Sequence, residues 1–129
     1  MIVLDTHTVI WILTQPERIS KAASAAIAAE GKLGHLPAIS SVTLFEIFYA
    51  RLRKRVQLHV SEEVLKTQLA HWFRPVAIDS EIATVAGTLQ PFHSDPIDRI
   101  IAATAIVHRC PLITADRRMH ESRVCKAIW

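Results

Sequence analysis

The chain has 129 residues, which suits one compact domain with a hydrophobic core and is too short for two. Half of the residues are hydrophobic and only three are glycine, so the composition favours an α/β or α protein over a disordered chain or a turn-rich all-β fold. The net charge of +3 is too small to indicate a nucleic-acid partner by itself. Asp5 and His7 interrupt the first apolar stretch, and no other apolar run reaches roughly 18 residues. We therefore expect no signal peptide and no membrane span, and predict a soluble, cytoplasmic protein.

Short apolar segments alternate with helical ones along the first half of the chain. We expect a strand at 2–5, a helix from 6 to about 13, a helix from 21 to about 30, a strand at 37–40 and a helix at about 42–55. Ser20 and Ser41 are suited to be N-caps, and Gly31 is suited to end the second of these helices.

The second half repeats this alternation. We expect a helix at about 62–73, a strand at 76–78, a helix at 80–89, a helix from 96 to about 108, a strand at 111–114, a short helical turn after 116 and an edge strand at 127–128. Ser61 is a good N-cap, and Asp95 followed by Pro96 is a strong signal for a helix start. The whole pattern predicts a single α/β domain over residues 1–129, with a mainly parallel sheet and helices on both faces.

The two cysteines, Cys110 and Cys125, lack the spacing of metal ligands and could form a pair or stay free. In a chain without an export signal, we expect two buried, reduced thiols.

Acidic residues stand where the apolar strands are expected to end. Asp5 follows the first strand, Asp116 follows a late one, and Asp98 opens the long apolar run between 100 and 107. In an open α/β sheet, ligand sites form outside the carboxyl ends of the strands, so carboxylates from distant segments can meet there. Their mutual repulsion is relieved by a hard divalent cation, and the pattern therefore suggests an Mg²⁺ or Mn²⁺ site.

Each acidic residue also has a structural interpretation. Asp5, Asp95 and Asp116 could simply cap the helices that follow them. Asp98 differs because helical periodicity puts it on the same small, apolar stripe as 101, 102 and 105, where a carboxylate needs a cation, a set of donors or a proton. Glu46 lies at the border of an apolar helix face and could reach solvent or pair with Arg53.

Basic residues cluster at 51–55 and directly after Asp116. The first cluster either complements a helix end or binds phosphate, and both roles can hold at once.

Four segments carry a family resemblance through their order and spacing. They are Ile2-Val3-Leu4-Asp5-Thr6-His7-Thr8, Ser40-Ser41-Val42-Thr43-Leu44-Phe45-Glu46-Ile47, His93-Ser94-Asp95-Pro96-Ile97-Asp98-Arg99-Ile100-Ile101-Ala102-Ala103-Thr104-Ala105, and Pro111-Leu112-Ile113-Thr114-Ala115-Asp116. With these segments the chain resembles, along essentially its whole length, the PIN-domain nucleases and specifically the VapC-like toxins of toxin–antitoxin pairs. Ala115 departs from the motif at a position that many relatives also vary.

The resemblance implies a sheet of about five parallel strands and an acidic site at one edge. It implies catalytic and metal-binding roles for Asp5, Glu46, Asp98 and Asp116, with Asp95 as a further candidate. It makes Thr6, Thr114, Arg99, Arg117 and Arg118 candidates for binding the substrate.

The resemblance also implies an activity and partners. The expected activity is that of an Mg²⁺- or Mn²⁺-dependent endoribonuclease, in which one or two ions polarise the phosphodiester and activate a water. The expected partners are an RNA substrate, a cognate antitoxin that occupies the active-site groove, and a second copy of the chain in a homodimer.

Three alternatives stay open from the sequence. The chain could be a housekeeping PIN nuclease in RNA processing or a PIN fold kept as a non-catalytic binding module. A phosphoaspartate enzyme is less well supported, because Asp5-Thr6-His7 has histidine where the dehalogenase-type motif needs a second aspartate.

Overall fold

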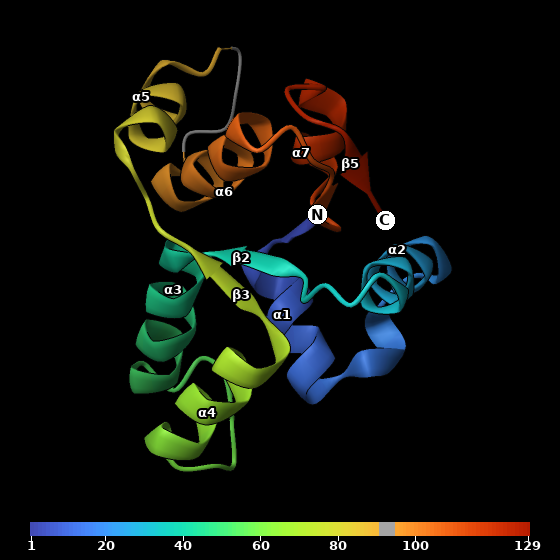
Figure 1. The fold of residues 1–129 in the computed structure, drawn as a ribbon. Coiled ribbons are helices and arrows are strands. Elements are labelled where there is room, and N and C mark those ends of the chain that lie inside the picture. The colour runs from blue at the N-terminus through green and yellow to red at the C-terminus, as the bar shows by residue number, and fades with distance from the viewer. Residues whose placement is uncertain (91–94) are drawn as a thin grey trace.

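A computed structural model describes residues 1–90 and 95–129 and contains one five-stranded sheet (Figure 1). The strands are β1 (Val3–Leu4), β2 (Ala38–Ser40), β3 (Arg74–Val76), β4 (Leu112–Ile113) and β5 (Ala127–Ile128). Their order is β3-β2-β1-β4-β5, and every neighbouring pair is parallel. The predicted parallel α/β architecture is confirmed.

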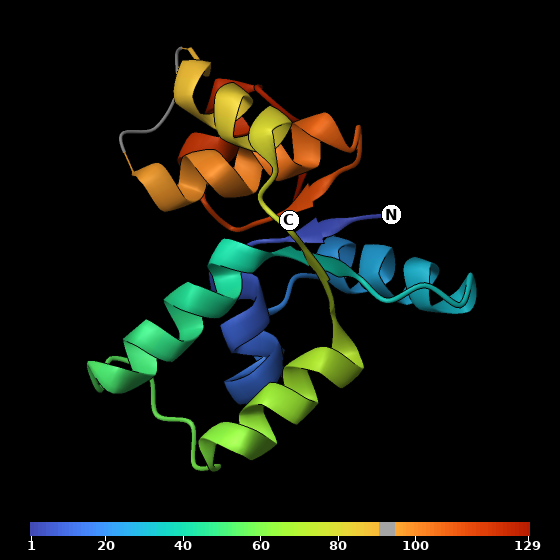
Figure 2. The same ribbon diagram turned by 60° about the vertical axis from the view of Figure 1, so that its left-hand side comes forward.

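Helices cover both faces of this sheet (Figure 2). They are α1 (Thr6–Thr14), α2 (Lys21–Lys32), α3 (Ser41–Leu52), α4 (Glu62–Trp72), α5 (Ser80–Thr88), α6 (Pro96–Val107) and α7 (Arg117–Ser122), with a 3₁₀ turn at Pro16–Arg18. Helices α1 to α4 pack on one face, and α6 and α7 pack on the other, with α5 lying against α6.

Both faces of the sheet are apolar, because successive side chains of each strand point alternately into two cores. Leu4, Ile39 and Ile113 point into the core shared with α1 to α4. Val3, Ala38 and Leu112, the preceding residues in each strand, point into the core shared with α6 and α7. By the same alternation, the residues that follow Leu4, Ile39 and Ile113 point to the face of the sheet that α6 and α7 cover.

Four local predictions from the sequence are wrong. Gly31 lies inside α2, and the chain instead turns at Gly34, whose φ of +75° favours glycine. Ser40, with an extended backbone, is the N-cap of α3, and Ser41 is its first residue. The Ser41 hydroxyl donates to the carbonyl of Val76 on β3 at 2.8 Å. Helix α3 ends at Leu52, and β3 lies two residues earlier than expected.

Other local predictions are confirmed. Ser20, Ser61 and Asp95 accept capping hydrogen bonds from the backbone, and Pro96 is the first residue of α6. The edge strand at 127–128 is present. His93 and Ser94 of the family motif lie outside the described residues.

Both cysteines are free, as predicted, although only Cys110 is buried and Cys125 is half-buried. Burial raises the pKa of both thiols, that of Cys125 to about 11. None of the described helices has the length and apolar character of a membrane span.

Candidate active site

A row of three oxygen-bearing side chains stands at the carboxyl ends of the central strands. Ser40 ends β2, Asp5 follows β1 and Thr114 follows β4, and the strand register places the three side by side. The ladder continues through this row, because Asp5 N–H donates to the carbonyl of Ile113 at 3.1 Å. Since side chains alternate along a strand, the row points to the face that α6 covers.

Asp5 is the buried centre of the row, with 6% of its surface exposed. One carboxylate oxygen accepts the N–H of Thr8 at 2.7 Å, which caps α1. The other accepts a hydrogen bond from the hydroxyl of Thr114. Within residues 1–90 and 95–129 Asp5 forms no ion pair, so a buried negative charge is held by neutral donors alone. Burying a carboxylate in this way is costly, and a cation beside it would offset the cost.

Thr114 connects Asp5 to Asp116. Its hydroxyl oxygen, which donates to Asp5, also accepts the N–H of Asp116 at 3.1 Å. Asp116 in turn caps α7, because its carboxylate accepts the N–H of Arg118 at 2.8 Å. The ring Nε2 of His120 lies 2.8 Å from the carbonyl oxygen of Thr114 and steadies this turn. Two aspartates far apart in sequence therefore lie at one edge of the sheet.

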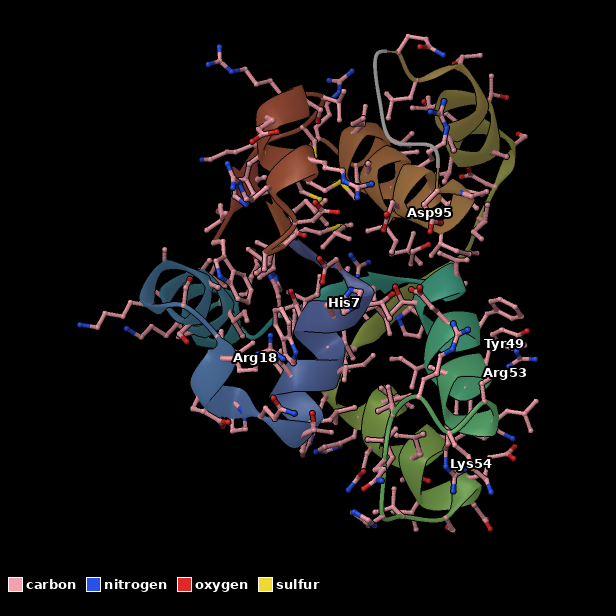
Figure 3. The ribbon with its side chains drawn as sticks, turned by 180° about the vertical axis from the view of Figure 1, so that it is seen from behind. His7, Arg18, Tyr49, Arg53, Lys54 and Asp95 are labelled. Atoms are coloured by element: carbon pink, nitrogen blue, oxygen red, sulfur yellow. The ribbon has the colours of Figure 1, made fainter. Side chains whose placement is uncertain are left out.

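The start of α6 brings Asp95 and Asp98 to the same edge. Asp98 stands one turn before Ile101 and Ala102, which pack against Val3 of β1, and it is half-buried. The N-terminal end of α6 lies over the start of α3, and the two helices are in contact (Figure 2). Asp95 is exposed and caps α6 through the N–H of Ile97 at 2.9 Å (Figure 3).

Glu46 reaches this edge from α3. Thr6 donates a hydrogen bond of 3.3 Å to the hydroxyl of Thr43, which lies one helical turn before Glu46. Thr6, Glu46 and Ile97, the neighbour of Asp98, all line one groove of about 1290 Å³. The groove therefore adjoins all the predicted acidic segments except the one at Asp116.

In the described residues, the acidic side chains do not form a complete metal-binding site. In the part of the chain that the structure describes, no three aspartate, glutamate, histidine or cysteine side chains converge as metal ligands. Asp5 and Asp116 are instead engaged in capping and in the Thr114 link. The donor chemistry nevertheless fits a hard cation, because the hydroxyl oxygen of Ser40 is buried in the same row and has no partner among the described residues. The shared metal site stays a prediction.

The predicted basic residues differ in their surroundings. The guanidinium of Arg99 donates to the carbonyls of Ala86 at 2.8 Å and Leu89 at 2.8 Å, and so binds the C-terminal end of α5 to α6. These bonds join the two helices, and the phosphate-binding role expected of Arg99 from the sequence stays a prediction. Arg117 and Arg118 are exposed beside Asp116, and Arg117 forms a loose pair with Glu121 at 3.4 Å.

Sequence reasoning missed Ser40 and Thr43. Ser40 could have been found as the last residue of β2, which stands beside Asp5 in the parallel register. The contact of Thr43 with Thr6 joins two helices and leaves no signal in the sequence.

Comparison with known proteins identifies the family. The family model of the PIN domain matches residues 2–124. The chain belongs to the PIN domain family. Ribonuclease VapC22 of Mycobacterium tuberculosis is 37% identical over 123 residues, which cover 95% of this chain and 92% of that protein.

Solved structures share the fold of this PIN domain. A toxin–antitoxin complex from Klebsiella pneumoniae matches with a TM-score of 0.68 and 24% identity, over 97% of this chain and 95% of that chain. VapBC2 from Rickettsia felis, bound to a DNA fragment from its promoter, matches with a TM-score of 0.71 and 17% identity, over 98% of this chain and 97% of that chain.

Proposed function

We propose that this PIN domain, residues 1–129, is a divalent-metal-dependent endoribonuclease that acts as the toxin of a toxin–antitoxin pair. The observation that carries the proposal is the buried carboxylate of Asp5, linked through Thr114 to Asp116 at the carboxyl ends of the central strands. The similarity to a ribonuclease over 95% of the chain supports RNA as the substrate.

Asp5, Asp98 and Asp116 would hold Mg²⁺ or Mn²⁺, with Glu46 binding directly or through water and Asp95 as a further candidate. A divalent ion bound there supplies positive charge to a phosphodiester oxygen and lowers the pKa of a bound water. If an ion took the place of the hydrogen bond that Asp5 accepts from Thr114, that hydroxyl would be able to donate to phosphate. Thr6 lines the groove, and the exposed Arg117 and Arg118 stand beside Asp116, so these residues are suited to hold the RNA backbone.

The proposed partners are a cognate antitoxin and a second copy of the chain. The antitoxin would occupy the groove of about 1290 Å³ and exclude RNA from it. On α4, Val64 and Trp72 are exposed at 45% and 43% and offer apolar surface for one of these contacts, whereas Phe73 belongs to the core.

The proposal is tested by incubating the purified protein with a mixed RNA pool in Mg²⁺ or Mn²⁺, with chelator as a control. Wild type should cleave internally only when the metal is present, and Asp5→Asn should not cleave. The matched variant is Asp79→Asn, because Asp79 caps α5 as Asp5 caps α1, through an N–H at 2.8 Å, yet lies away from the row. Asp79→Asn should cleave like wild type. A wild-type protein that binds no metal and cuts no RNA would instead be a non-catalytic PIN module.

A further inference from the structure

Helix α3 carries a column of aromatic and cationic side chains on its exposed surface. The Phe45 side chain is 59% exposed and that of Tyr49 45% exposed. Their rings stack with centroids 5.6 Å apart and planes 9° apart. The guanidinium carbon of Arg53 lies 5.8 Å from the centre of the Tyr49 ring. The spacing of four residues puts all three on one side of the helix, where large apolar faces meet solvent.

This column belongs to the groove that begins at the acidic edge. Phe45 and Tyr49 line the groove together with Glu46, and its far end is lined by Lys54 and Arg55. Figure 3 shows Tyr49, Arg53 and Lys54 following one another along α3 and its C-terminal end. The groove therefore leads from the carboxylate of Glu46, past two stacked rings, to cations.

Lys54 is held in a backbone conformation that favours glycine. Its φ is +54°, and it occupies the turn that ends α3, where the N–H of Arg55 donates to the carbonyl of Ala50 at 2.9 Å. A side chain in this conformation is disfavoured relative to glycine. What lysine adds in return is a positive charge at the end of the groove. Arg51 is different, because it donates to the carbonyl of Val60 at 2.6 Å and fixes the loop after α3.

We propose that the Phe45–Tyr49 pair is a stacking platform for the bases of a single-stranded stretch of RNA, with Lys54 and Arg55 contacting its phosphates. The inference rests on the proposed function and describes how the RNA substrate lies in the groove beyond the acidic edge of the sheet. Exposed aromatic rings beside a basic groove are the features that bind single strands without reading their sequence. Among the described residues that line the groove, Glu46 is the one acidic side chain, so the charge favours a polyanion over a second copy of the same basic surface.

The stacking is tested with Tyr49→Leu, which removes the ring, and Tyr49→Phe, which keeps it. Binding is measured by fluorescence anisotropy in chelator, which prevents cleavage, using a labelled RNA of roughly ten nucleotides. A second probe is an abasic strand of the same length, which has the phosphates and no bases. Tyr49→Leu should weaken binding of the natural strand at least about fivefold and leave that of the abasic strand within about twofold. Tyr49→Phe should bind both probes like wild type.

The phosphate contact is tested with Lys54→Gly, and Arg109→Gly is its matched control. Arg109 has a φ of +50° at the same kind of helix end, after α6, and precedes β4, so it lies at the opposite end of the sheet from Asp5. Each variant loses one positive charge and places glycine at a position with a left-handed backbone conformation, so both should melt at a higher temperature than wild type. Only Lys54→Gly should weaken binding of both probes, and it should reduce the slope of log affinity against log salt by about 0.7.

Three results would overturn the platform. They are an unchanged affinity of Tyr49→Leu for the natural strand, an equal loss for both probes, and equal effects of Lys54→Gly and Arg109→Gly. If the first of these results came together with a change from dimer to monomer in Tyr49→Leu, it would assign the rings to a second copy. In each of these cases wild type still cleaves RNA, whereas failure of the proposed function appears as absence of metal-dependent cleavage by wild type.

Discussion

Replacing Asp5 with asparagine should separate the stability of the fold from its response to metal. Asparagine caps a helix as well as aspartate, so the N–H of Thr8 keeps its acceptor. The hydrogen bond from Thr114 changes from a charged to a neutral one, which costs about 1 kcal/mol. Removing a buried charge that has only neutral partners offsets that cost. We expect the melting temperature of metal-free Asp5→Asn to be within about 4 °C of wild type.

The effect of metal should be much larger. At a free Mn²⁺ concentration of 100 times its Kd, binding to the folded state alone stabilises wild type by about 2.7 kcal/mol. For 129 residues, the entropy of unfolding is roughly 0.27 kcal mol⁻¹ K⁻¹, so 1 kcal/mol corresponds to about 4 °C. Wild type should therefore melt about 10 °C higher in Mn²⁺ than in chelator, and Asp5→Asn should lose most of this shift.

Differential scanning calorimetry with and without Mn²⁺ measures both effects. Asp79→Asn is the control, because it changes an equivalent cap at 2.8 Å from the N–H of Ile82 and should keep the full shift. If Asp5→Asn kept the shift, the ion would bind elsewhere and the role given to Asp5 would be wrong. If metal-free Asp5→Asn were unfolded, the carboxylate would be needed for the fold, and the reasoning about its burial would be refuted.

Three further predictions concern the surroundings of the site. Ser41→Ala should lower the free energy of unfolding in urea by about 1 kcal/mol, because it loses a hydrogen bond to β3. Ser40→Ala should not lower the free energy of unfolding, and it should reduce the melting shift in Mn²⁺. A larger loss of stability in Ser40→Ala than in Ser41→Ala would contradict the unpartnered state of the Ser40 hydroxyl. Arg99→Met should lower the free energy of unfolding by about 2–4 kcal/mol, because it removes the hydrogen bonds that join α5 to α6. RNA affinity of the folded variant decides the second role: an affinity like that of wild type would leave Arg99 with the helix-joining role alone, and a selective loss would place it among the phosphate-binding residues. Burial raises the pKa of Cys125 to about 11, so the folded state favours the neutral thiol. The resulting contribution to stability is complete below the thiol pKa of the unfolded chain, about 8.5, and is lost as the pH rises toward 11. Alkylation of Cys125 at pH 8 should accordingly be slow until urea unfolds the chain, and Cys125→Ala should weaken the alkaline loss of stability.

The sequence by itself determined the class of fold and most of its elements. Apolar segments too short to be helices, separated by helix-length segments with good caps, leave a parallel sheet covered on both faces as the natural arrangement. The start of α6 was predictable because Asp95 and Pro96 act locally, on the first turn of the same helix. Helix ends were less predictable, since the end of α2 depends on a turn at Gly34 and not on the first glycine available.

The candidate site was predictable in its members and not in its contacts. Asp5 and Asp116 could be named because both follow apolar strands, and parallel strands bring such residues to one edge. Only the tertiary structure decided that Thr114 joins them, that Ser40 completes the row, and that Arg99 donates a hydrogen bond to the end of α5. The physical reason is that strand and helix patterns come from neighbours in sequence, whereas the partner of a buried polar group is set by which elements the fold places beside it.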